Sequence, residues 1–203
     1  MAAYYYLASQ LPYLIPGQEP PMSAAAFREL AAGFLDDEDR AQIDRCVLAA
    51  PPETPPVLPP APGEPPALKS GFIKGWLEWE RALRLNLARF RSQRLKREGA
   101  AEAPDYPADA VQAAKAASAM DSPLEAEIFI DKARWDAIER LRGLDDVGSN
   151  MVFAYLLKLL LMERRSSFKT EEGFMEYKSL YAAISGDAAG GVSAGNVRPE
   201  ASR

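Results

Sequence analysis

The residues best suited to chemistry in this sequence are carboxylates, since the chain contains no histidine. Glu125 and Asp131 stand in "SPLEAEIFIDKARW", and Asp131 falls between Ile128 and Trp135 on an apolar stripe with helical spacing. Such a carboxylate can act as a general acid or base. Alternatively, it is a buried hydrogen-bond anchor that needs a partner, either Arg134 or an arginine of a preceding basic helix. We favour the anchor and predict no catalytic residue.

A second group of acids, Asp36 to Asp39, opens the segment "LDDEDRAQIDRCVLAA". Four acids could hold a metal ion, but no other type of ligand is near them in the sequence. Acids at the start of a helix interact favourably with its dipole. This pattern therefore predicts helix capping, and we expect neither a metal nor a cofactor.

A run of cations between residues 81 and 97 contains no acid and follows several aromatic residues. Three interpretations stay open: a solvated face whose cations suit a helix C-terminus, a surface for nucleic acid or anionic lipid, and a surface for an acidic protein partner. The net charge of −5 argues against nucleic acid as the main partner. The candidate interface residues are Arg81, Arg84, Arg89, Arg91, Arg94 and Arg97.

Helical periodicity and capping signals position these residues, and no convincing strand is found, so we predict an all-α bundle of about six helices. Ser122 and Pro123 mark the start of one helix, and Gly143 marks its end. The segment from Met151 to Met162 contains one charged residue and predicts a helix at the centre of the bundle. Other helices are expected after Ser23, over residues 68–99, after Pro107 and over 170–185. The stripe predicted for the helix after Ser122 is Leu124, Ile128, Trp135 and Ile138.

Nine of the 17 prolines fall within residues 51–66, which predicts an extended spacer. We therefore expect an N-terminal helical segment (1–50), a proline-rich linker (51–67), a main helical bundle (68–185) and a disordered tail (186–203). The opening "MAAYYYLASQLPYLIPG" has no Lys or Arg and is too short to span a bilayer, so it predicts packing surface and neither a signal peptide nor an anchor. The single cysteine, Cys46, fits a reducing cytoplasm.

Three segments together resemble a bacterial family encoded in operons for V-type (archaeal-style) rotary ATP synthases: "YYYLASQLPYLI", "PLEAEIFIDKARWDAIERL" and "SNMVFAYLLKLLLMERRSSF". That family is distantly similar to the helical, funnel-shaped component of the V-type enzyme that joins the rotor shaft to the membrane ring, which we call the funnel protein. The chain has room for about two of its three repeats, and Pro12 and Pro16 replace the arginine pattern that follows the opening tyrosine-leucine. By this likeness the repeat residues are Glu125, Asp131, Trp135 and Asn150, with a fainter set at Trp76, Glu80 and Asn86.

The resemblance implies a non-catalytic adaptor between the rotor shaft and the membrane ring. Its partners would be other components of the synthase, with no small-molecule substrate and no nucleic acid. The protein would be cytoplasmic, peripheral to the inner membrane, and would meet the membrane only through the complex. Glu125, Asp131 and Asn150 would be buried structural polar residues. An accessory or assembly factor of the same machine is the alternative, as is a binding module that uses the basic helix on nucleic acid or anionic lipid.

Overall fold

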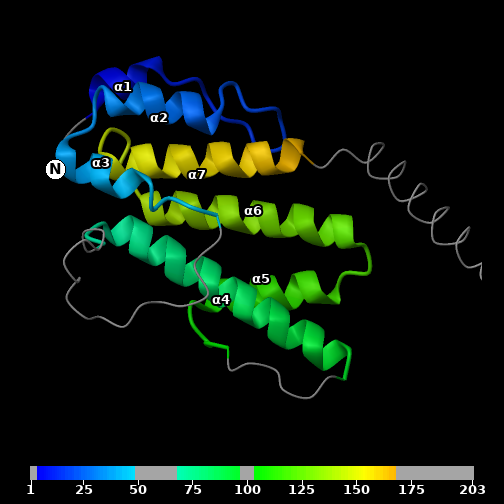
Figure 1. Cartoon of the computed structure of the whole chain (residues 1–203). Helices are drawn as coiled ribbons and strands as arrows, with labels where there is room; N and C mark the ends of the chain where they lie inside the picture. Colours follow the sequence, from blue (N-terminus) through cyan, green and yellow to red (C-terminus); the bar gives the residue numbers. More distant parts are fainter. Residues whose placement is uncertain (1–3, 49–67, 97–102, 168–203) are drawn as a thin grey trace, which may run out of the picture. The chain divides into compact units, whose positions relative to one another are not determined.

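The computed structural model describes residues 4–48, 68–96 and 103–167 (Figure 1). Within these ranges the chain forms seven helices and no strand, which confirms the all-α bundle. The chain divides into two units, Met1–Arg165 and Ser166–Arg203, and the helices belong to the first except for the last residue of α7. The helices are α1 (Tyr5–Gln10), α2 (Ala24–Ala32), α3 (Asp37–Ile43), α4 (Gly71–Arg94), α5 (Ala108–Ala119), α6 (Pro123–Arg142) and α7 (Ser149–Ser166).

Three predicted features lie outside the described residues: the proline-rich linker 51–67, the helix over 170–185 and the tail 186–203. The proposed division between residues 1–50 and 68–185 stays a prediction. In the described ranges, the N-terminal helices and the later helices contribute side chains to one hydrophobic core.

Short-range signals set the helix boundaries. Ser23, Ser70 and Ser122 each precede a helix, and each side chain accepts a hydrogen bond from the backbone N–H three residues further on. Pro123 occupies the first turn of α6, where its missing N–H costs nothing. Gly143 ends α6 with a φ of +62°, a conformation that favours glycine. The start and end predicted for this helix are confirmed.

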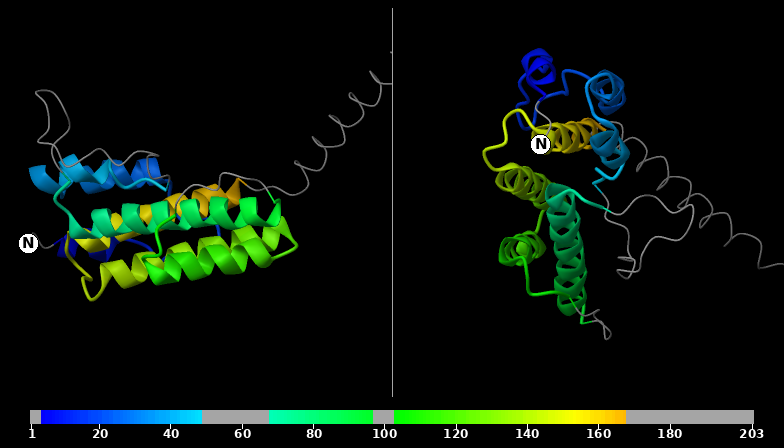
Figure 2. Two further views of the ribbon diagram at one scale, coloured as in Figure 1. Left: turned by 90° about the horizontal axis from the view of Figure 1, so that it is seen from below. Right: turned by 90° about the vertical axis from the view of Figure 1, so that its left-hand side faces the viewer.

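Helix α7 lies at the centre of the first unit, between the N-terminal helices and α6 (Figures 1 and 2). The ring of Tyr155 on α7 packs 4.9 Å from that of Phe27 on α2, measured between centroids, while Phe153 packs 6.4 Å from Phe72 on α4. A helix buried nearly all round must be apolar nearly all round, as predicted from the sequence. Its buried residues are Met151, Val152, Phe153, Ala154, Leu156, Leu157, Leu159, Leu161 and Met162.

Helices α4, α5 and α6 pack closely against one another because small side chains separate them. The helix expected after Pro107 is present as α5, and its buried face is entirely alanine. Gly75 on α4 allows a second close approach, since a Cβ at this position would lie 2.8 Å from the Leu141 side chain of α6. The buried residues of α5 are Ala110, Ala113, Ala114 and Ala117.

The apolar stripe predicted for α6 is only partly buried, which corrects the face assigned from the sequence. Leu124 and Ile128 are 52% and 40% exposed, whereas Ile138 is buried. The helix carries a second apolar row of smaller residues, and that row faces the other helices because α5 and α4 come close to it. Its apolar members are Ala126, Ile130, Ala137 and Ile138.

The N-terminal tyrosine segment forms the short helix α1 and the loop that follows it. Leu7 and Tyr4 are buried, as expected for packing surface, but Tyr6 is 80% exposed. The loop is attached to the central helix because the Tyr155 hydroxyl donates to the carbonyl oxygen of Pro12 at 2.9 Å. None of the helices described in the structure has the length and apolar character needed to cross a membrane.

Candidate functional site

The most strongly built polar feature is a pair of ionised residues between α4 and α6. Glu80 has no exposed side-chain surface, and the Arg134 side chain is 5% exposed. Arg134 donates from Nε to Glu80 Oε2 at 3.0 Å and from Nη2 to Oε1 at 2.9 Å, so the pair is bidentate. Arg84, one turn along α4, adds a third hydrogen bond from Nε to Glu80 Oε1 at 2.7 Å.

Asp131 extends this pair toward α7. Its Oδ1 accepts from Arg134 Nη1 at 3.2 Å and from Arg164 Nη1 at 3.3 Å, and Arg164 Nη2 also donates to Glu127 Oε2 at 2.7 Å. Three arginines and three carboxylates therefore alternate across α4, α6 and α7 and sum to zero charge. We call this set the interior ion-pair chain: Arg84, Glu80, Arg134, Asp131, Arg164 and Glu127.

Burial and charge act in opposite directions on the titration of these groups. Burial raises the pKa of Asp131 above its ordinary value, against the opposing effect of Arg164 and Arg134. Burial would lower the pKa of Arg134, but the hydrogen bonds and negative charges of Glu80 and Asp131 outweigh it and raise that pKa. Arg134 therefore remains a cation, and its carboxylate partners are engaged by arginines within the protein.

The predicted buried anchor, Asp131, lies where the sequence indicated, beside Arg134. Its second arginine is Arg164 of α7, however, and not one from the basic helix α4. The arginine that α4 does contribute, Arg84, binds Glu80 instead. This arrangement braces three helices through charged groups that face one another.

Glu125 and Asn150 occupy different positions from those expected. Glu125 is exposed, so its predicted burial is wrong: it stands in the first turn of α6, and its backbone N–H donates to the Ser122 hydroxyl. Asn150 is half-buried at the start of α7, where its N–H donates to Asp145 Oδ2 at 3.1 Å. Glu80 is the buried acid that the interface and core assignments missed, although its place on the stripe of Trp76 was visible.

The basic surface of α4 is partly neutralised by acids of the same chain. Arg89 Nη1 lies 3.5 Å from Asp105 Oδ1, and Arg94 Nη2 lies 3.1 Å from Asp121 Oδ1. Arg94 also donates to two backbone carbonyls at the end of α5. These contacts fit the cations to the neighbouring loops. Arg81 and Arg91 are exposed, and Arg97 lies outside the described residues.

The acids at the start of α3 serve the helix and its neighbours. Asp36 caps the helix by accepting from the Asp39 backbone N–H at 2.8 Å, as predicted. The Asp39 side chain accepts from the Tyr4 hydroxyl at 2.6 Å, and burial together with this carboxylate raises the Tyr4 pKa. Among the residues that the structure describes, no group of three or more potential ligands could hold a metal ion.

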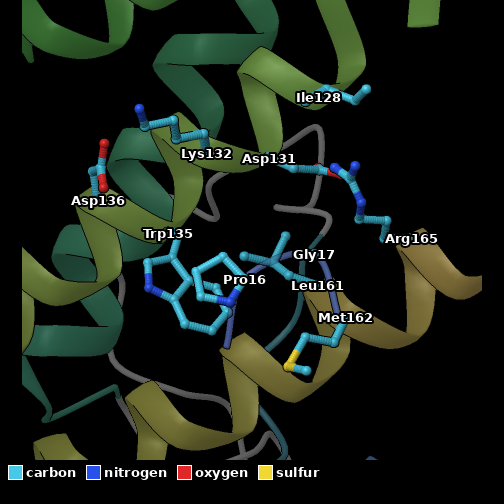
Figure 3. Close-up of a pocket in the computed structure, with 10 residues that line it drawn as sticks. All are labelled: Pro16, Gly17, Ile128, Asp131, Lys132, Trp135, Asp136, Leu161, Met162 and Arg165. Atoms are coloured by element: carbon cyan, nitrogen blue, oxygen red, sulfur yellow. The ribbon is translucent and has the colours of Figure 1, made fainter. Parts of the chain in front are cut away.

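A pocket of about 310 Å³ opens between α6, α7 and the loop after α1 (Figure 3). Lys132 and Asp136 lie on one side of it, and Arg165 lies on the other, pointing toward Asp131. Trp135 forms part of the wall, and the ammonium group of Lys158 lies 5.0 Å from the centre of its ring. The apolar lining is Pro16, Ile128, Trp135, Leu161 and Met162.

Comparison with known proteins adds no relative to this picture. No protein-family model matches the chain, and no curated protein or solved structure shows significant similarity to it.

Proposed function

We propose that this chain is a non-catalytic component of a V-type rotary ATP synthase, an adaptor like the funnel protein between the rotor shaft and the membrane ring. The assignment to this machine rests on the sequence resemblance. The structural observation that best supports an adaptor is the interior ion-pair chain, because its arginines engage the buried carboxylates that an enzyme of this composition would use.

A part that carries torque must resist sliding of its helices. Close packing of α4 against α5 and α6 resists small displacements. Sliding of α4 along α6 would also separate Glu80 from Arg134 and leave both charges buried without partners, which is strongly unfavourable. These features suit a stiff body that works by holding its shape.

The exposed side of α4 is the proposed contact with an acidic partner surface. Arg91 projects from this helix near its C-terminal end and is exposed. Arg89 and Arg94 bind Asp105 and Asp121, so the charge available for nucleic acid or anionic lipid is smaller than the sequence suggests. A protein partner with a limited acidic patch fits this surface better.

The test is affinity purification of the tagged full chain from detergent-solubilised membranes of the native host. We expect components of the rotor shaft and the membrane ring to co-purify. Arg91→Glu should reduce their recovery at least tenfold, whereas Lys74→Glu, an equal charge change on the first turn of α4, should leave it unchanged. Recovery without any synthase component would refute the proposal, and recovery only with partial complexes would indicate an assembly factor.

Salt-dependent binding to anionic vesicles or to DNA would point to the competing role. The same two variants separate the cases, because a lipid or nucleic-acid surface would lose affinity with Arg91→Glu in the absence of any synthase component. A gel-shift assay and vesicle sedimentation at low salt supply this measurement.

A further inference from the structure

Helix α6 has an apolar row that the rest of the described chain does not cover. Leu124 and Ile128 lie one turn apart, and both remain more than a third exposed. Trp135 continues the row by two turns and is half-buried by the loop at Pro16. An exposed apolar row beside a pocket is a common feature of protein-binding surfaces.

The pocket at the end of this row is held in shape before any partner binds. Lys158 stacks over Trp135 and also binds Glu139 of α6, which fixes the indole from behind. The opposite wall is held because Tyr155 hydrogen-bonds Pro12 in the same loop. Figure 3 shows Trp135 and Pro16 facing each other across the hollow. A preformed pocket loses little conformational freedom when it is filled.

The charge around the mouth favours an anion. Asp131 is already matched, since the interior ion-pair chain is neutral without Arg165. Lys132 and Asp136 carry opposite charges one turn apart on α6 and offset each other. Arg165 is the remaining cation, and no ion pair involving it occurs within the described ranges. An apolar hollow with one surplus arginine is complementary to an apolar group that has a carboxylate beside it.

We propose that this pocket is a docking site for an acidic segment of a partner protein, which places one bulky apolar side chain against Trp135 and Ile128 and a carboxylate against Arg165. The pocket volume of about 310 Å³ is at the lower end of the range for small-molecule sites. The apolar row that leads into it provides room for the rest of a peptide. The inference extends the proposed function by giving the adaptor a second contact surface, on α6 and α7.

The experiment uses the full chain as bait for a displayed library of random twelve-residue peptides. Enriched peptides should share a bulky apolar residue with Asp or Glu within one helical turn of it. Synthetic copies should lose at least tenfold in affinity for Ile128→Glu, and a copy with Lys in place of the acid should lose a similar factor for the wild type. Arg165→Glu should restore binding of the Lys copy, a reversal that general damage to the fold could not produce.

Leu144→Glu and Arg91→Glu are the matched controls, since Leu144 is fully exposed and Arg91 lies on α4. Both should bind the selected peptides like the wild type. No enrichment, enrichment without acids, or tight binding of naphthalene-sulfonate in place of peptides would overturn the proposal. Because Arg91→Glu tests the proposed synthase contact separately, peptide binding without co-purified synthase components would reject the function and keep the pocket.

Discussion

Two arginine–carboxylate pairs that involve helix α4 have nearly the same geometry in very different surroundings. Arg134 meets Glu80 at 3.0 Å and 2.9 Å inside the bundle, where the two side chains are 5% and 0% exposed. Arg94 meets Asp121 at 3.1 Å on the surface, where they are 57% and 96% exposed. Distance alone therefore does not indicate what a pair contributes, because water replaces the partner only at the surface.

The largest effect should come from removing the interior arginine. Arg134→Met leaves Glu80 buried with Arg84 as its remaining ion partner and Asp131 with Arg164. We expect a loss of about 3–5 kcal/mol in the free energy of unfolding, the usual result of breaking a buried pair from one side. Urea denaturation followed by circular dichroism measures it. A loss below about 1 kcal/mol would place this pair in the same energetic class as the surface pair.

Removing both partners separates the value of the pair from the cost of an orphaned charge. Glu80→Met combined with Arg134→Met should be more stable than Arg134→Met alone by about 2 kcal/mol or more, because no unmatched acid remains between α4 and α6. The same denaturation assay provides the comparison. A double variant less stable than the single one would show that packing, and not charge burial, dominates at this position.

Two carboxylates on α6 should respond to acid in opposite directions. The pKa of Asp131 is raised above 3.8, so ionisation there opposes folding, and the wild type gains stability relative to Asp131→Asn as the pH falls through that pKa toward 3.8. Burial alone would raise the pKa of Glu139, but Lys158 and Arg142 lower it below 4.5. Its contribution is present above 4.5 and is lost as the pH falls through its folded pKa, which Glu139→Gln would not show.

Denaturation midpoints of the wild type and the two variants at about pH 7, 5, 4 and 3 give the measurement. The difference between wild type and Asp131→Asn should move in favour of the wild type on acidification, and the difference from Glu139→Gln should move against it. Parallel profiles for the two variants would contradict the opposite shifts.

The smallest effect is expected at the surface. Arg94→Met removes the contact with Asp121 and two hydrogen bonds to carbonyls near the end of α5. We expect a loss of about 0–1 kcal/mol, and raised salt should reduce it further. Thermal unfolding at low and high ionic strength checks this. A loss comparable to that of Arg134→Met would mean that α5 depends on Arg94 for its position.

Local signals predicted the helices well, because a cap such as Ser122 or the apolar density of α7 acts over a few residues. Relations between distant residues were not visible. Glu80 and Arg134 are 54 positions apart, so no spacing rule could join them. The face of α6 was misassigned because periodicity identifies apolar rows, while only the neighbouring helices decide which row is covered. Likewise, nothing in the run of arginines on α4 announced the acids that Arg89 and Arg94 would meet.

The hydrogen bond from the Ala24 backbone N–H to Glu163 Oε1, at 2.7 Å, joins residues 139 positions apart. During translation the N-terminal helices therefore emerge long before the helix that covers them. At 5–20 residues per second, that gap amounts to roughly ten to thirty seconds. Throughout this interval Phe27 lacks Tyr155 and remains open to chaperones or to other nascent chains. The N-terminal part of this bundle thus depends on protection by other proteins until the ribosome has produced α7.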